Sequence, residues 1–144
     1  MTTVANILSQ KGRRVITARA EQTLAEICDL LAANKIGAVV LTDGDMHIDG
    51  ILSERDIVRA IAQEGPAVLA MPASGHMSRN VVTAREQDTI EQVMGRMSEG
   101  RFRHMPIVRD GRLIGVVSIG DVVKLKIEQA EREAAEIRAY IAAS

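Results

Sequence analysis

The sequence predicts an α/β fold (mixed α+β). Two pseudo-symmetric halves, each with the order β-α-β-β-α, pack sheet to sheet before a long C-terminal helix. The first observation is an internal repeat, because Thr17 and Thr83 lie 66 positions apart and Gly50 and Gly115 lie 65 apart. The second is that short apolar strands alternate with helical spacing of apolar residues in both halves. Two copies indicate half-units that pack on each other, so a site at their junction should occur in pairs.

The composition predicts an aliphatic core and a cytoplasmic protein. Of the 144 residues, 47% are apolar but only 1% are aromatic. This scarcity argues against single-stranded nucleic-acid binding, which uses aromatic stacking. The net charge of −1 gives no general attraction to nucleic acids or anionic membranes. No stretch approaches the roughly 20 apolar residues of a membrane span, and the single cysteine, Cys28, excludes an internal disulfide.

The first half contains a clear helix start. Thr23 and Glu26 have the spacing of a capping box, in which a hydroxyl and a carboxylate satisfy the first unpaired amides of a helix. Apolar residues at 3.6-residue spacing follow, and an Asp/Gly-rich turn separates the next two apolar runs. The expected elements are a helix after Thr3, a strand at residues 15–17, a helix after Thr23, strands at residues 38–41 and 48–52, and a helix from Ser53.

The second half repeats this order after a segment rich in proline and glycine. Asp110-Gly111 is a strong signal for a tight hairpin. The expected elements are a strand at residues 81–83, a helix capped by Thr89 with Gln92 behind it, and strands at residues 104–108 and 112–118. The expected boundaries are 1–63 for the first repeat with its N-terminal helix, 64–75 for the linker, 76–125 for the second repeat and 126–144 for a helical extension.

The C-terminal helix carries an apolar seam with heptad spacing. Glu128 and Arg132, four residues apart, support its charged outer face. The seam can lie along its own domain or against a partner's helix, and its small central alanines favour the second arrangement, a homodimer. The seam residues are Val123, Ile127, Ala130, Ala134, Ile137 and Ile141.

Both halves end in the pattern G-x-x-S-x-x-D where the last strand meets the following helix. The two copies run from Gly50 to Asp56 and from Gly115 to Asp121, each with a Thr-ended strand upstream. Together with the doubled strand and helix order, this pattern resembles a tandem pair of CBS (cystathionine β-synthase) domains, also called a Bateman module. The resemblance extends over roughly residues 4–125.

The resemblance implies a stand-alone regulatory protein and not an enzyme. Such pairs bind adenosyl ligands, including AMP, ADP, ATP, S-adenosylmethionine and sometimes NAD(H), in clefts between the repeats and signal by a conformational change. The motif Asp then accepts hydrogen bonds from the ribose hydroxyls. Carried over to this sequence, the ribose-binding residues are Asp56, Asp121, Ser53, Ser118, Thr17 and Thr83, and the adenine-contacting residues are Ile16, Val82, Val39 and Met105.

The chemistry of the motif agrees with this role and also permits a simpler one. A carboxylate offers acceptor sites on two oxygens, which match the two donors of a vicinal diol. The amides of a helix N-terminus keep such a carboxylate ionised. However, Ser-x-x-Asp at a helix start is itself a capping arrangement, so Asp56 and Asp121 can both be caps alone.

The halves differ where a phosphate would bind. Arg103 and His104 precede the middle-strand proline of the second half, where the resemblance implies phosphate contacts, whereas Gly37 and Ala38 occupy these positions in the first. The two sites are therefore not equivalent, and Gly37 leaves room for a larger ligand such as NAD(H). The predicted phosphate-binding residues are Arg103, His104, Lys11, Arg13, Arg14 and Arg55.

Other functions receive little support from the sequence. The segment from Asp45 to Asp56 approaches a calcium loop, but a histidine replaces one ligand and an aspartate replaces the closing glutamate. The three histidines lack metal-ligand spacing, and no nucleophile–base group is evident. Two alternatives to a nucleotide sensor remain, a ligand-independent scaffold for an unidentified protein and, with less support, an enzyme that acts on a nucleotide.

Overall fold

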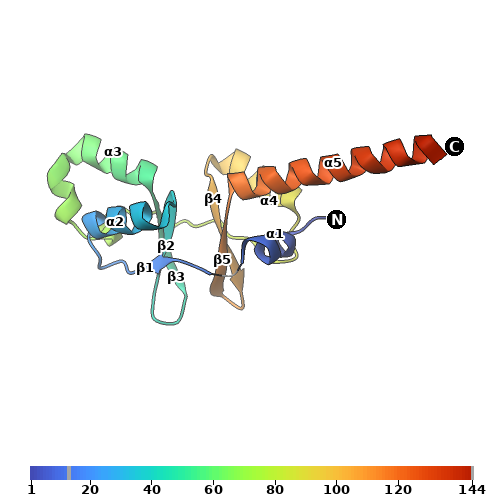
Figure 1. Cartoon of the computed structure of the whole chain (residues 1–144). Helices are drawn as coiled ribbons and strands as arrows, with labels where there is room; N and C mark the ends of the chain where they lie inside the picture. The colour runs from blue at the N-terminus through green and yellow to red at the C-terminus, as the bar shows by residue number, and fades with distance from the viewer. Residues whose placement is uncertain (13, 144) are drawn as a thin grey trace.

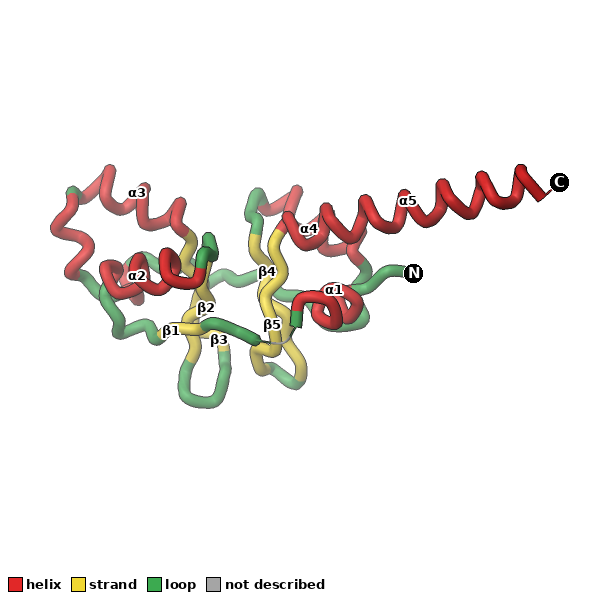
Figure 2. Tube along the Cα trace, in the orientation of Figure 1, coloured by secondary structure: helices red, strands yellow, loops and turns green. Residues whose placement is uncertain are grey.

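The computed structural model describes residues 1–12 and 14–143 and contains two small sheets at its centre. In the first, β1 (Thr17–Ala18) is parallel to β2 (Ala38–Thr42), which is antiparallel to β3 (Ile48–Ser53). In the second, β4 (His104–Arg109) and β5 (Arg112–Ser118) are antiparallel. The sheets lie side by side, with α2 and α3 outside the first and α1, α4 and α5 outside the second (Figures 1 and 2). The predicted fold class is confirmed.

The helices of the first half begin where the sequence predicts. α2 (Leu24–Asn34) is capped by Thr23, whose Oγ1 accepts the amide of Glu26 at 3.2 Å, while the Thr23 amide donates to Glu26 Oε1 at 3.2 Å. This reciprocal capping box confirms the expected start. After β3, α3 (Glu54–Glu64) follows Ser53. Two short 3-10 helices, Pro66–Ala70 and Ala73–Gly75, lie within residues 64–75, the range expected for the linker.

The second half has one strand fewer than expected. α4 (Ile90–Gly100) follows its Thr89 cap as predicted, but residues 81–83 form no strand. Only Ala84 pairs with Ile107, donating to the Pro106 carbonyl at 3.0 Å and accepting from Val108 at 2.9 Å. Continuing this ladder would require an N–H at Pro106 to reach Val82, and proline has none. The first half has Val40 at the corresponding position, and β1 begins two residues and ends one residue later than the strand predicted at residues 15–17.

Each half is completed by a segment from outside its repeat. α1 (Val4–Lys11) buries Val4, Ile7 and Leu8 in the core of the second half. Conversely, Ala73 and Met77 are buried in the core of the first half. Each hydrophobic core therefore contains residues from outside the sequence range expected for its repeat. The boundaries at residues 63 and 76 stay a prediction about the repeats in the sequence.

The N-terminal helix is held at both ends by the second half. Its first amides, of Val4 and Ala5, donate to the carbonyls of Asp88 and Glu86 at 2.9 and 3.0 Å. Asp88 is itself fixed by the Arg96 guanidinium at 2.9 Å and the Arg85 amide at 2.9 Å. Opposing contributions act on this carboxyl: burial raises its pKa, but the bonds from Arg85 and Arg96 prevail, so the pKa is lowered.

The last helix, α5 (Ile119–Ala143), is 25 residues long and extends away from the body of the molecule (Figure 1). Its first turns contribute Val122 and Leu125 to the core of the second half. Beyond them, the apolar seam is mostly exposed within one chain, with Ile127 and Ile137 at 54% and 60% exposure. The seam therefore does not lie along its own domain.

We predict that Gly50→Ala destabilises the chain because two segments approach each other closely at this position. A Cβ at Gly50 would lie 2.8 Å from the Ser78 carbonyl oxygen and 2.7 Å from Met77 Sδ. The backbone oxygen cannot move without breaking its bond to Ile51, so the free energy of unfolding should fall by about 1–3 kcal/mol. Urea unfolding measures this loss. Gly75→Ala, where nothing lies within 4 Å of the new Cβ, is the control, and an equal effect of both changes would contradict the prediction.

Candidate functional site

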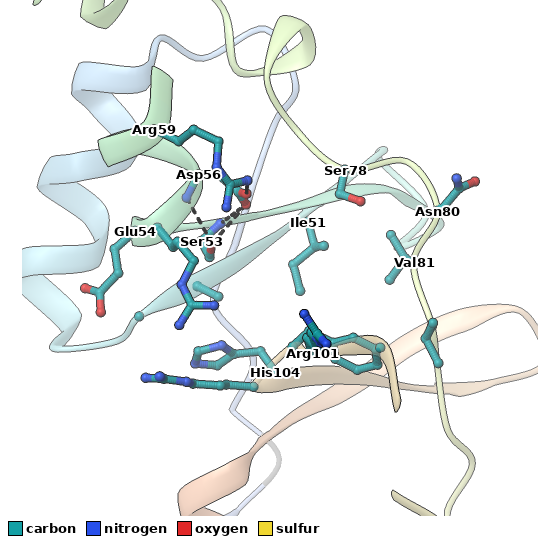
Figure 3. A pocket seen from close by; sticks show the side chains of 17 residues that line it. Ile51, Ser53, Glu54, Asp56, Arg59, Ser78, Asn80, Val81, Arg101 and His104 are labelled. Atoms are coloured by element: carbon teal, nitrogen blue, oxygen red, sulfur yellow. Dashed lines mark hydrogen bonds and ion pairs between the residues drawn. The ribbon is translucent and has the colours of Figure 1, made fainter. Parts of the chain in front are cut away.

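A cavity of about 440 Å³ opens between the two halves and is called the Asp56 cavity below. One wall is the junction of β3 with α3, from Ser53 to Asp56, with Arg59 one turn further on. The facing wall is the segment Gly100–His104 of the second half, which joins α4 to β4. Ser78, Asn80 and Val81 lie at one end (Figure 3), and Val82 is also part of the lining. The cavity thus lies at the junction where the sequence repeat predicts a site.

Asp56 caps α3 with one carboxylate oxygen, while the other forms an ion pair with Arg59 and accepts no hydrogen bond from the described residues. Its Oδ2 accepts from the Ser53 amide at 2.8 Å and the Ser53 hydroxyl at 2.9 Å. Its Oδ1 lies 3.8 Å from Arg59 Nη1, beyond hydrogen-bond distance. The capping role left open by the sequence is therefore real, and it uses only part of the acceptor capacity of this carboxylate.

The Asp56 cavity carries an excess of positive charge. Four arginines line it, against two carboxylates, those of Glu54 and Asp56. In Figure 3, Arg101 and His104 lie below the junction that bears Asp56 and Arg59. Because guanidinium groups pair with phosphate and carboxylate in a planar, two-bonded geometry, such a cavity favours an anionic ligand. The four arginines are Arg55, Arg59, Arg101 and Arg103.

His104 lies between the two halves. A Cβ added to Gly37 would lie 3.4 Å from His104 Cε1 and 3.4 Å from Glu54 Oε1, so the imidazole and this carboxylate border the space beside Gly37. Burial lowers the pKa of His104, and the charges of Lys11 and Arg103 lower it further, while Glu54 and Asp121 partly offset them. The imidazole is therefore neutral at pH 7 and can donate from one ring nitrogen and accept at the other.

The second motif has a different environment. Asp121 Oδ2 accepts from the Ser118 amide at 2.8 Å, as in the first motif, but also from Lys11 Nζ at 2.7 Å. The same ammonium donates to the Val116 carbonyl at 2.9 Å. Burial raises the pKa of Asp121, but the Lys11 and Ser118 hydrogen bonds outweigh it and lower that pKa overall. Neither Asp121 nor Ser118 lines the Asp56 cavity.

The structure brings together some of the site residues predicted from the sequence and separates others. Those that line the Asp56 cavity are Ser53, Arg55, Asp56, Val82, Arg103 and His104. Those outside its lining are Lys11, Arg14, Ile16, Thr17, Val39, Thr83, Met105, Ser118 and Asp121. Val39 and Met105 are buried in the two cores. Arg13 lies outside the described residues. The binding role of each residue remains a prediction.

Several lining residues were missed by sequence reasoning. Arg59 had a detectable signal, because it lies three residues after Asp56 and so on the same face of α3. Arg101 ends α4 in the left-handed conformation, with φ 57°, and its counterpart Lys35 does the same with φ 53°. The remaining missed residues come together only through the fold and are Ala38, Ile51, Glu54, Ser78, Asn80, Val81, Gly100 and Phe102.

Residues 1–12 and 14–143 contain neither a metal-binding cluster nor a membrane-spanning helix. There, no three His, Cys, Asp or Glu side chains gather as metal ligands. In the same part of the chain, no helix has both the length and the apolar character needed to cross a membrane.

Comparison with known proteins decides the family. The sequence profile of the CBS domain matches twice, at residues 4–63 and 73–128. The chain belongs to the CBS-domain family. It is 46% identical to the CBS-domain containing protein ATU1752 from Agrobacterium tumefaciens, with a TM-score of 0.84 over 87% of this chain and 99% of that one.

Other relatives show the range of proteins that contain this CBS pair. The chain is 27% identical to the mitochondrial CBS domain-containing protein CBSX3 of Arabidopsis thaliana, over 97% of this chain and 72% of that protein. It spans only 24% of the length of several larger CBS domain-containing relatives from the same plant. The CBS domain pair of protein MJ0100, solved with 5-methylthioadenosine and S-adenosyl-L-methionine, is 28% identical with a TM-score of 0.80, over 90% of this chain and 98% of that one.

We predict that Asp121→Asn costs more stability at pH 7 than at pH 3. The pKa of Asp121 is lower in the folded CBS pair than in an unfolded chain, where it is about 3.9. Its ionised form therefore stabilises the fold above that value, and this contribution is lost as the pH falls through the folded pKa. Urea unfolding at both pH values measures the difference. Asp45→Asn in the exposed β2–β3 loop is the control, and a loss from Asp121→Asn that does not change with pH would refute the prediction.

Proposed function

We propose that this CBS pair is a cytoplasmic regulatory protein that binds an adenine nucleotide in the Asp56 cavity. The observation that carries the proposal is the pairing of a partly available carboxylate with four arginines in one cavity between the halves. Asp56 Oδ1 is an acceptor for a ribose hydroxyl, and the arginines provide the charge that a phosphate group requires. The candidate ligands are AMP, ADP, ATP and NAD(H).

Different observations support the adenosine group and the phosphate group of the proposed ligand. The CBS pair of MJ0100 was solved with two adenosyl compounds, which supports an adenosyl ligand for a pair with the same fold. However, S-adenosylmethionine carries a positively charged sulfonium, and the Asp56 cavity has more arginines than carboxylates. We therefore expect phosphorylated adenosine to bind here more tightly than S-adenosylmethionine. Val82, 43% exposed at the edge of the cavity, is the proposed apolar contact for adenine.

The proposed output is a change in the relative orientation of the halves, without catalysis. A ligand that contacts Asp56 in one half and Arg103 or His104 in the other stabilises the orientation in which both contacts form. A regulated protein that prefers this orientation then binds with an affinity that depends on the nucleotide. α5, which extends away from the body of the molecule, offers one surface on which this regulated protein can dock.

We further propose that the chain forms a homodimer through the exposed seam of α5. The seam places Ile127 and Ile137, which are 54% and 60% exposed, on one face of a helix that extends away from the body of the molecule (Figure 1). Apolar residues at heptad spacing bury this face when two such helices pair. The charged outer face, which includes Arg132, stays in water.

Ligand binding is tested by thermal unfolding with AMP, ADP, ATP, NAD⁺, NADH and S-adenosylmethionine. At 100 times its dissociation constant, a ligand of the folded state stabilises it by about 2.7 kcal/mol. We expect a shift with at least one phosphorylated ligand, and its loss in Asp56→Ala. Asp45→Ala, in the exposed loop between β2 and β3, should keep the shift. Absence of a shift with every ligand, in protein freed of bound nucleotide, would favour the scaffold alternative, whereas turnover of a nucleotide would favour an enzyme.

The dimer is tested by light scattering coupled to size-exclusion chromatography. Ile137→Asp places a charge in the apolar seam and should convert dimer to monomer at micromolar concentration, because a carboxylate buried between helices has no partner there. Arg132→Asp introduces the same group on the outer face of the helix and should leave the dimer intact. A wild-type chain that elutes as a monomer, or an Ile137→Asp variant that remains dimeric, would disprove the proposed seam.

A further inference from the structure

We propose that Lys11 blocks the second motif, so that each chain binds one nucleotide, at Asp56, and none at Asp121. The proposal rests on the proposed function, because it concerns which of the two motifs the nucleotide uses. It predicts unequal sites in a chain whose two motifs are alike in sequence. Lys11 is then the residue that determines this selectivity.

The ammonium of Lys11 is paired with the Asp121 carboxylate, on the same oxygen that caps α5. Lys11 Nζ lies 2.7 Å from Asp121 Oδ2 and 2.9 Å from the Val116 carbonyl oxygen. Asp121 Oδ2 also accepts the Ser118 amide. A ribose diol that used both oxygens of this carboxylate would have to displace a short, charge-assisted hydrogen bond. At Asp56 it would displace only the hydrogen bond from the neutral Ser53 hydroxyl. There, the Arg59 guanidinium forms a longer ion pair, at 3.8 Å, with the Asp56 oxygen that does not cap the helix.

A backbone difference between the halves explains why a lysine reaches one motif and not the other. In the first half, the Ile51 carbonyl accepts the Ser78 amide at 2.9 Å. Val116 stands 65 positions after Ile51, and its carbonyl accepts from the Lys11 ammonium instead. A side-chain cation thus takes the role that a backbone amide has in the first half. Ser78 is uncharged, so its backbone hydrogen bonds with Ile51 place no cation beside Asp56.

Lys11 is held in this position by the packing of α1. It is the last residue of α1 and lies one turn after Ile7, which is buried in the core of the second half. The first turn of α1 is tied by its amides to the carbonyls of Glu86 and Asp88. A helix fixed along its length presents the ammonium to Asp121 without further ordering of its backbone.

The second motif also lacks part of the phosphate-binding charge. Gly120 stands where the first motif has Arg55, and Gly37 stands where the facing wall of the Asp56 cavity has Arg103. Moreover, the His104 ring lies against Gly37. A nucleotide at Asp121 would therefore lose an ion pair and gain fewer charged contacts, which favours the Asp56 cavity.

The proposal is tested by titration calorimetry with AMP on the full chain. We expect the wild type to bind one AMP per chain, Asp121→Ala to bind one, and Asp56→Ala to bind none. Lys11→Met keeps the aliphatic length and the helix propensity but removes the charge, and it should raise the stoichiometry to two. Lys11→Arg should stay at one. Lys126→Met removes an exposed ammonium paired with Glu91 and is the matched control, with one AMP expected.

The pKa of Asp121, followed by carbon NMR of its carboxyl, provides a readout that needs no ligand. It should rise in Lys11→Met and stay unchanged in Lys126→Met, because Lys11 donates to this carboxylate whereas Lys126 pairs with Glu91. Two AMP per wild-type chain with similar affinity, or one per chain in Lys11→Met, would overturn the block. An unchanged Asp121 pKa in Lys11→Met would show that the Lys11 ammonium does not act on this carboxylate, and the proposed block would then have no physical basis. If neither wild type nor Lys11→Met binds AMP, ADP, ATP or NAD(H) while the pKa still rises, the proposed function fails although the ion pair exists.

Discussion

The rest of this structure depends on the way each half buries its core with a segment that belongs elsewhere in the chain. α1 contributes Ile7 and Leu8 to the second half, and the segment after α3 contributes Ala73 and Met77 to the first. Because a small sheet with one or two helices has too little apolar area to be stable alone, each half needs this cover. The exchange ties the halves together and fixes the segments that border both motifs.

The same exchange makes the two motifs chemically unequal. The segment that reaches the first sheet pairs through the backbone of Ser78 and continues into residues that line the Asp56 cavity. The segment that reaches the second ends in a lysine that pairs with Asp121. Two copies with nearly the same strand–helix junction therefore differ in what faces the carboxylate, and this difference comes from the covering segments and not from the motifs.

Much of the architecture could be predicted from the sequence because it depends on local signals. Capping residues such as Thr23 and Thr89, the hairpin at Asp110-Gly111 and the spacing of the repeat act over a few residues or recur in register. The features that the sequence did not predict depend on contacts between residues far apart in the chain. The strand expected at residues 81–83 depends on the N–H that Pro106 lacks, and the Lys11–Asp121 pair joins residues 110 positions apart. The spacing of residues along the sequence does not reveal such a contact. Arg101 likewise lines the cavity only because the two halves pack against each other.

The length of α5 has a mechanical consequence for any motion of the second half. A straight helix of 25 residues is about 37 Å long at 1.5 Å per residue, so rotating its base by about 5° displaces its tip by roughly 3 Å. Val122 and Leu125 fix that base in the core of the second half. If the second half rotates as proposed, the helix would therefore convert a small change of angle into a displacement comparable to a hydrogen-bond length at its far end.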